Sequence, residues 1–167
     1  MATFTLLHVL ISLAGIGTGF IVLYGLLTGK RLDGWTAIFL VTTVLTSLTG
    51  FLFPFKHLLP SHIVGAISLL VLALAIFGRY VRNLAGAWRW IYVVSAVLAL
   101  YLNVFVAIVQ AFLKVPALKA IAPHQTEPPF VLAQVGAMAV FIVLGIVAVR
   151  KFHAEPVHSA YRTGATQ

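Results

Sequence analysis

Five long apolar stretches, each without Asp, Glu, Lys or Arg, follow one another along the chain and are joined by short polar connections. An α-helix rises about 1.5 Å per residue, so about 20 apolar residues cross a hydrocarbon core of about 30 Å. All five stretches are long enough for one crossing. The pattern predicts an all-α, polytopic membrane bundle of five transmembrane helices, near residues 4–28, 35–53, 61–78, 87–113 and 129–149.

The composition agrees with lipid as the solvent. Hydrophobic residues make up 62% of the 167-residue chain and charged residues 8%, which leaves too little polar surface for a water-soluble globule. The formal net charge of +8 would suit nucleic acid only if the cations clustered on one soluble face. They lie instead singly or in pairs at the ends of apolar stretches, where Lys and Arg meet lipid headgroups. We therefore expect the lipid bilayer as partner and no nucleic acid.

The distribution of cations predicts how the bundle is oriented. An excess of Lys and Arg marks the cytoplasmic side of a membrane protein, which puts the N-terminus outside and the C-terminus in the cytoplasm. Residues 1–151 then form the transmembrane domain of a multi-pass inner-membrane protein, and residues 152–167 form a short flexible cytoplasmic tail. The predicted inner cations are Lys30, Arg31, Arg79, Arg82, Arg89, Arg150, Lys151 and Arg162, and the predicted outer ones are Lys56, Lys114 and Lys119.

Two histidines of the predicted outer side lie on helix faces that point into the bundle. His8 shares a helical stripe with Ser12, Gly15 and Gly19, and His62 heads a row of small residues on the third helix. Two imidazoles at similar depth on different helices suit the two axial positions of a haem b iron. In this outline the chain resembles the membrane b-type cytochromes, although the paired histidines on one helix that serve two haems there are missing. The resemblance implies haem b as cofactor, His8 and His62 as ligands, and a redox role only with haem bound.

A divalent metal is a second use for the same side chains. His8, His62 and His124, together with Glu127 in the last outer loop, offer nitrogen and oxygen ligands that suit Zn or Cu. A purely structural interpretation stays open as well. In it these histidines lie at an interface, begin a helix, or hydrogen-bond to a neighbouring helix.

Polar side chains inside the apolar stretches predict a pocket or pathway in the outer half of the bundle. An unpaired amide in hydrocarbon costs several kcal/mol, so each amide must find partners across the bundle or in trapped water. Thr46, Asn103, Gln110 and Gln134 are the candidates. They line either a ligand pocket or the path of a small-solute channel or permease.

The acidic residues exclude carboxylate-pair chemistry. Asp33 and Glu155 lie on the predicted inner side and Glu127 on the outer side, so no pair can meet around a scissile bond. No catalytic residue is therefore assigned. A third class of function is an accessory subunit, whose small-residue faces bind a larger membrane partner or a second copy of the chain.

Overall fold

The structure is a computed structural model that describes residues 2–52 and 60–153, with side chains from residue 3 to 52 and from 62 to 153. Within these ranges the chain is helical and contains no strand. The elements are α1 (Ala2–Leu27), α2 (Asp33–Gly50), α3 (Pro60–Ile76), the π-helix η1 (Phe77–Val81), α4 (Trp88–Lys114), α5 (Pro116–Ile121) and α6 (Pro128–Lys151). The five long helices agree with the predicted ranges to within a few residues, whereas η1 and α5 were not predicted.

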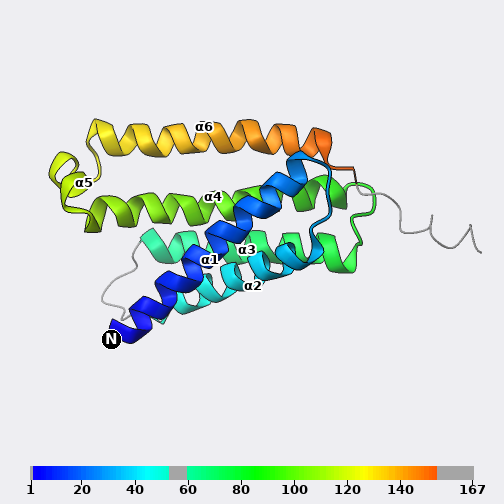
Figure 1. The fold of residues 1–167 in the computed structure, drawn as a ribbon, viewed down its shortest axis with the longest axis horizontal. Helices are drawn as coiled ribbons and strands as arrows, with labels where there is room; N and C mark the ends of the chain where they lie inside the picture. Colours follow the sequence, from blue (N-terminus) through cyan, green and yellow to red (C-terminus); the bar gives the residue numbers. More distant parts are fainter. Residues whose placement is uncertain (1, 53–59, 154–167) are drawn as a thin grey trace, which may run out of the picture.

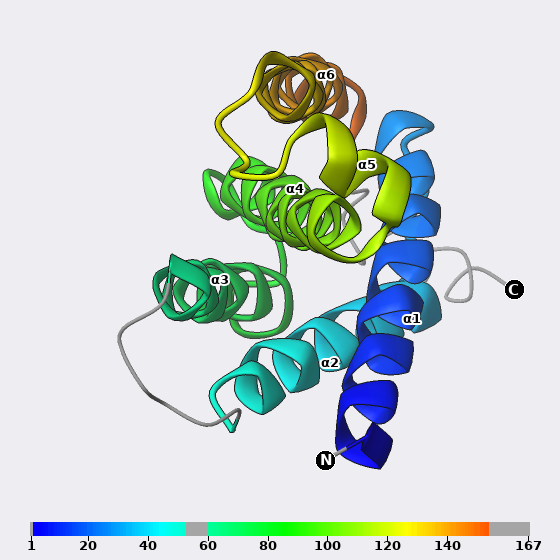
Figure 2. The ribbon, with the colours of Figure 1, turned by 90° about the vertical axis from the view of Figure 1, so that its left-hand side faces the viewer.

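Successive long helices run in opposite directions along the molecule, so the chain turns alternately at its two ends (Figure 1). We call them the histidine end, which holds His8, His62 and α5, and the arginine end, which holds Arg79, Arg82 and Arg89. α4 is central, because it contacts α1, α3 and α6, while α2 packs between α1 and α3. Figure 2 shows this arrangement from the histidine end.

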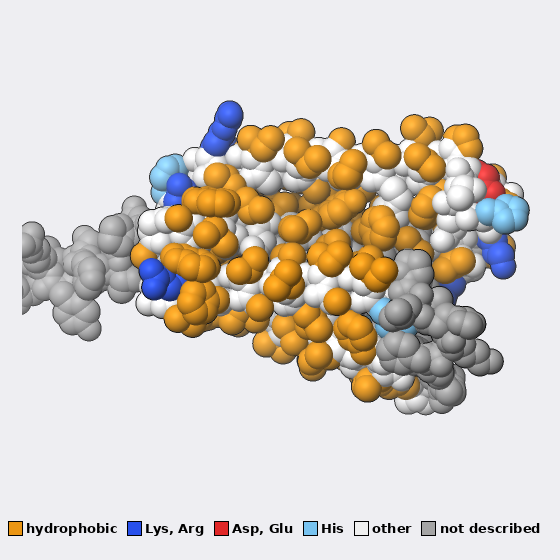
Figure 3. Space-filling view, turned by 180° about the vertical axis from the view of Figure 1, so that it is seen from behind, with side chains coloured by type: hydrophobic (Ala, Val, Ile, Leu, Met, Phe, Trp, Pro, Cys, Tyr) orange, Lys and Arg blue, Asp and Glu red, His pale blue; other side chains and the backbone are white. Residues whose placement is uncertain are grey.

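Four helical segments are long and apolar enough to cross a membrane, namely α1, α3 with η1, α4 and α6. α2 has 18 residues and is not among them, because Asp33 and its many hydroxyl side chains lower its hydropathy. Hydrophobic side chains cover the middle of the molecule on the face drawn in Figure 3, and charged side chains gather at its two ends. The described part of the chain is therefore a multi-pass membrane bundle of at least these four segments.

Several hydroxyl side chains inside the helices donate hydrogen bonds to carbonyl oxygens one turn back. Thr42 donates to Ile38 at 2.7 Å and Thr49 donates to Leu45 at 2.7 Å. Thr18 makes the same bond to Ala14. Such bonds satisfy the hydroxyl group without water, which is why a threonine-rich helix is tolerated beside lipid.

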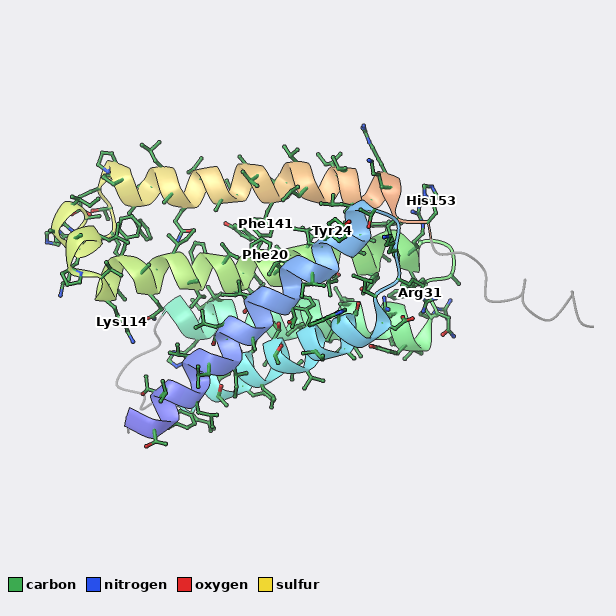
Figure 4. All side chains as sticks on the ribbon, viewed as in Figure 1. Phe20, Tyr24, Arg31, Lys114, Phe141 and His153 are labelled. Atoms are coloured by element: carbon green, nitrogen blue, oxygen red, sulfur yellow. The ribbon has the colours of Figure 1, made fainter. Side chains whose placement is uncertain are left out.

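Close approach of α1 to its neighbours depends on glycine. A Cβ atom on Gly19 would lie 2.5 Å from Leu100 of α4 and 2.9 Å from the ring of Phe39 of α2. Farther along, Phe20 of α1 and Phe141 of α6 face each other with ring centroids 6.3 Å apart (Figure 4). Small residues that let helix backbones approach are a principal source of packing energy in membranes.

The arginine end contains a buried charge that the sequence pattern did not predict. Arg79 on η1 is 2% exposed and pairs with Asp33 at the start of α2, while its guanidinium lies 5.1 Å from the centre of the Tyr92 ring. Arg89 donates to the carbonyl oxygens of Val149 and Phe152, which ties the end of α6 to α4.

Phe152 is 1% exposed and packs against Tyr92. The first residue of the expected flexible tail therefore belongs to the core, and the tail beyond residue 153 lies outside the described residues.

Candidate ligand cavity

A cavity of about 610 Å³ lies among α1, α2, α3 and α4 at the histidine end. It brings together five of the residues that the sequence singled out, which come from four different helices. Hydroxyl, imidazole and amide groups share its wall with apolar side chains. Its polar lining residues are Thr5, His8, Ser12, Thr46, Ser47, His62, Ser68, Asn103, Gln110 and Lys114.

The orientation of the His8 ring is fixed by α2. Its Nδ1 lies 2.8 Å from Oγ1 of Thr49. The Thr49 hydroxyl donates its hydrogen to the carbonyl oxygens of Leu45 and Thr46, so the tautomer of His8 that suits this contact is the one with the proton on Nδ1. Nε2 is then the nitrogen with the lone pair, which is the form that ligates a metal or haem iron.

His62 enters the same cavity from the first turn of α3. Its side chain is 7% exposed, and its ring lies 5.8 Å from the ring of Phe51, which also lines the cavity. Gly65, one turn farther along α3, leaves room for that phenyl ring, because a Cβ there would lie 3.2 Å from it. The two imidazoles thus line one cavity from two helices.

Thr46 and Asn103 line the cavity wall but differ in their hydrogen bonds. Asn103 of α4 donates a hydrogen bond of 3.1 Å to the buried Thr43 of α2, so it also joins two helices. The Oγ1 atom of Thr46 is buried and has no hydrogen-bond partner within the described protein. A buried hydroxyl that lacks a partner favours a ligand or water in the cavity beside it. Gln110, the third predicted polar residue on these helices, is exposed and lines the cavity too.

Gln134 is not part of this cavity. It lies between α6 and α4, where its Nε2 donates a hydrogen bond of 3.2 Å to the carbonyl oxygen of Phe105. The predicted set of polar residues is therefore divided, with Thr46, Asn103 and Gln110 on the cavity and Gln134 at another helix contact.

His124 and Glu127 form a pair of their own in the connection between α5 and α6. Their Nδ1 and Oε1 atoms are 3.0 Å apart, and the His124 side chain is 82% exposed. Desolvation alone would raise the pKa of Glu127, but hydrogen bonds from its own amide, from the amide and ring of His124 and from the Thr126 amide lower that pKa to about 2. This carboxylate thus shapes the loop, in which Gln125 is further tied to the carbonyl oxygen of Val109 at 2.9 Å.

The structure therefore does not gather the four expected metal ligands. His8 and His62 line the cavity, whereas His124 and Glu127 lie in the loop. Among all residues described, no three His, Cys, Asp or Glu side chains are close enough to hold a metal ion. His57, the other histidine of this side, lies outside the described residues.

Sequence reasoning did not assign Ser47, Ser68 and Lys114 to a site, and it missed Thr5 as well. Ser68 of α3 accepts a hydrogen bond of 3.2 Å from Ser47 of α2, so these serines join the two helices beneath His62. Lys114, the last residue of α4, was assigned only to the membrane boundary. The sequence signal that could have placed Lys114 in the site was its predicted position at the same depth as His8.

Comparisons of the chain with protein-family models, with curated proteins and with solved structures find no match.

Proposed function

We propose that this chain is a small inner-membrane protein that binds haem b between His8 and His62. The observation that carries the proposal is the shared cavity, because imidazoles from two separate helices line one space of about 610 Å³. A bare divalent metal has less support, since no third ligand stands beside these two among the described residues. Haem b needs only two protein ligands.

The residues present fit such a group. The contact between Nδ1 of His8 and the Thr49 hydroxyl is of the kind that orients and strengthens imidazole ligands. The unpartnered Thr46 hydroxyl and the half-buried Asn103 amide supply polar groups, while apolar residues such as Val106 suit a macrocycle. When bound, haem b would supply one-electron chemistry, and the chain itself would set ligation and shield the iron from water.

The proposal includes α2 as a fifth span, with the N-terminus outside. Three features support it. α2 runs antiparallel to α1 and α3 along the molecule (Figure 1). Three of its hydroxyl groups, on Thr42, Ser47 and Thr49, donate within the helix, and its single charge, Asp33, pairs with Arg31 and Arg79 at the arginine end. That end also carries most of the described cations, which indicates the cytoplasmic side.

Titration of the purified, haem-free protein with haem in detergent micelles tests the function. We expect saturable binding with a shifted and sharpened Soret band, because imidazole coordination changes the ligand field of the iron. His8→Ala should weaken binding and alter the band. His124→Ala is the matched control and should leave both unchanged, because its exposed ring lies in the loop. Binding that is equally strong in His8→Ala would rule out the assigned site.

A permease and an accessory subunit have less support. Beyond the cavity, Gly19 of α1 packs directly against Leu100 and Phe39, which are 1% and 0% exposed, so apolar side chains close this part of the described bundle. The exposed apolar face of α6 would suit a partner protein or a second copy. Lipid chains cover such a face equally well.

A further inference from the structure

We infer that Lys114 binds an anionic group of the cavity's ligand. This inference rests on the proposed function and adds the chemical class of the ligand, which is a carboxylate-bearing molecule. For haem b the group is a propionate.

The inference is based on the charges of the side chains that line the cavity. The lining contains one permanent cation, Lys114, and two imidazoles, but no carboxylate. Both acidic residues of the described chain are engaged elsewhere. Asp33 pairs with arginines at the opposite end of the bundle, and Glu127 pairs with His124 in the loop. The printed lining therefore offers Lys114 no carboxylate partner, and an anionic group of a ligand would supply one.

The position of Lys114 agrees with this role. It is the last residue of α4, and Figure 4 shows its side chain leaving the helix on the side away from α6. Lys114 lines the same cavity wall as His8, from the end of α4. An anionic ligand held in this cavity would meet Lys114 on its wall, where a charge-assisted hydrogen bond is stronger than a neutral one.

A lipid phosphate offers the same anionic oxygens to a lysine near the membrane surface. The two sources differ in one respect, since only a ligand carboxylate makes affinity depend on the ligand's own charge. Haem and haem dimethyl ester separate them, because both can be coordinated by imidazole but only haem carries free propionates.

The experiment titrates wild-type protein, Lys114→Gln, Lys114→Arg and Lys119→Gln with each compound and follows the Soret band. In the wild type we expect haem to bind roughly fivefold more tightly than the ester, as an exposed ion pair is worth up to about 1 kcal/mol. Lys114→Gln should abolish this preference by weakening haem alone, and Lys114→Arg should retain it. Lys119→Gln is the control, because Lys119 on α5 does not line the cavity.

Equal affinity of the wild type for haem and ester overturns the inference while leaving the proposed function intact. So does an equal loss for both compounds in Lys114→Gln, since Lys114 would then act on the fold or on lipid. No band shift with either compound is a different result, because it removes the haem site itself.

Discussion

Replacing Asp33 with alanine is expected to lower the free energy of unfolding by about 3 kcal/mol, because it leaves the guanidinium of Arg79 buried without its counter-charge. Arg79 is 2% exposed, whereas the Asp33 side chain is 68% exposed, so the cost arises at the arginine. The guanidinium would keep its contacts with the rings of Tyr80 and Tyr92, which carry no counter-charge. Denaturant unfolding in detergent micelles, followed by the fluorescence of the tryptophans, measures the loss.

Two further variants make this prediction specific. Arg82→Ala should change stability by less than about 0.5 kcal/mol, because Arg82 is exposed and only stacks on Trp88. The double variant Asp33→Ala with Arg79→Met should be more stable than Asp33→Ala alone, since it removes the stranded charge. A double variant as unstable as the single one, or a harmless Asp33→Ala, would contradict an ion pair in which Asp33 compensates the buried charge of Arg79 and holds α2 against η1.

Gly19→Ala is expected to destabilise the bundle by about 2 kcal/mol through overpacking. The new Cβ atom would lie 2.5 Å from Cδ1 of Leu100 and 2.9 Å from Cε2 of Phe39. Both neighbours are fully enclosed, at 1% and 0% exposure, so α1 must move away from α2 and α4. The same unfolding measurement in micelles gives the change in free energy.

Gly17→Ala is the matched control for this contact. Gly17 lies on the same helix, and a Cβ atom there would have nothing within 4 Å. Alanine is the better helix former, so this variant should be neutral or slightly stabilised. Equal effects of the two substitutions would mean that glycine flexibility in α1, and not its contact with α2 and α4, determines stability.

The long helices were predictable because lipid leaves the backbone no alternative to continuous helix, so uncharged runs report their positions directly. Uncharged runs did not predict the position of Arg79. It follows an apolar run and was interpreted as a boundary cation, but the chain continues through the π-helical turn η1 and carries Arg79 into the protein. Neither a single π-helical turn nor the distant partner Asp33 leaves a periodic signal in the sequence.

The cavity was partly predictable for a similar reason. Helical spacing places His8 on the face of α1 that carries Gly15 and Gly19, and tight packing at these glycines turns that face inward. The choice of partner for an amide was not predictable, because any backbone carbonyl satisfies it. Asn103 donates a hydrogen bond to Thr43 of α2 and lines the cavity. Gln134 donates to a carbonyl oxygen of α4 and does not line the cavity. The His124 and Glu127 pair is local and gives no information about the cavity.

Electron paramagnetic resonance of the haem-loaded protein tests the central claim most directly, because it reports how many strong ligands hold the ferric iron. Ligation by both His8 and His62 predicts a six-coordinate, low-spin signal in the wild type, and a high-spin signal in each of His8→Ala and His62→Ala. A high-spin wild type, or a low-spin signal that survives both substitutions, would contradict the placement of the haem between these two histidines.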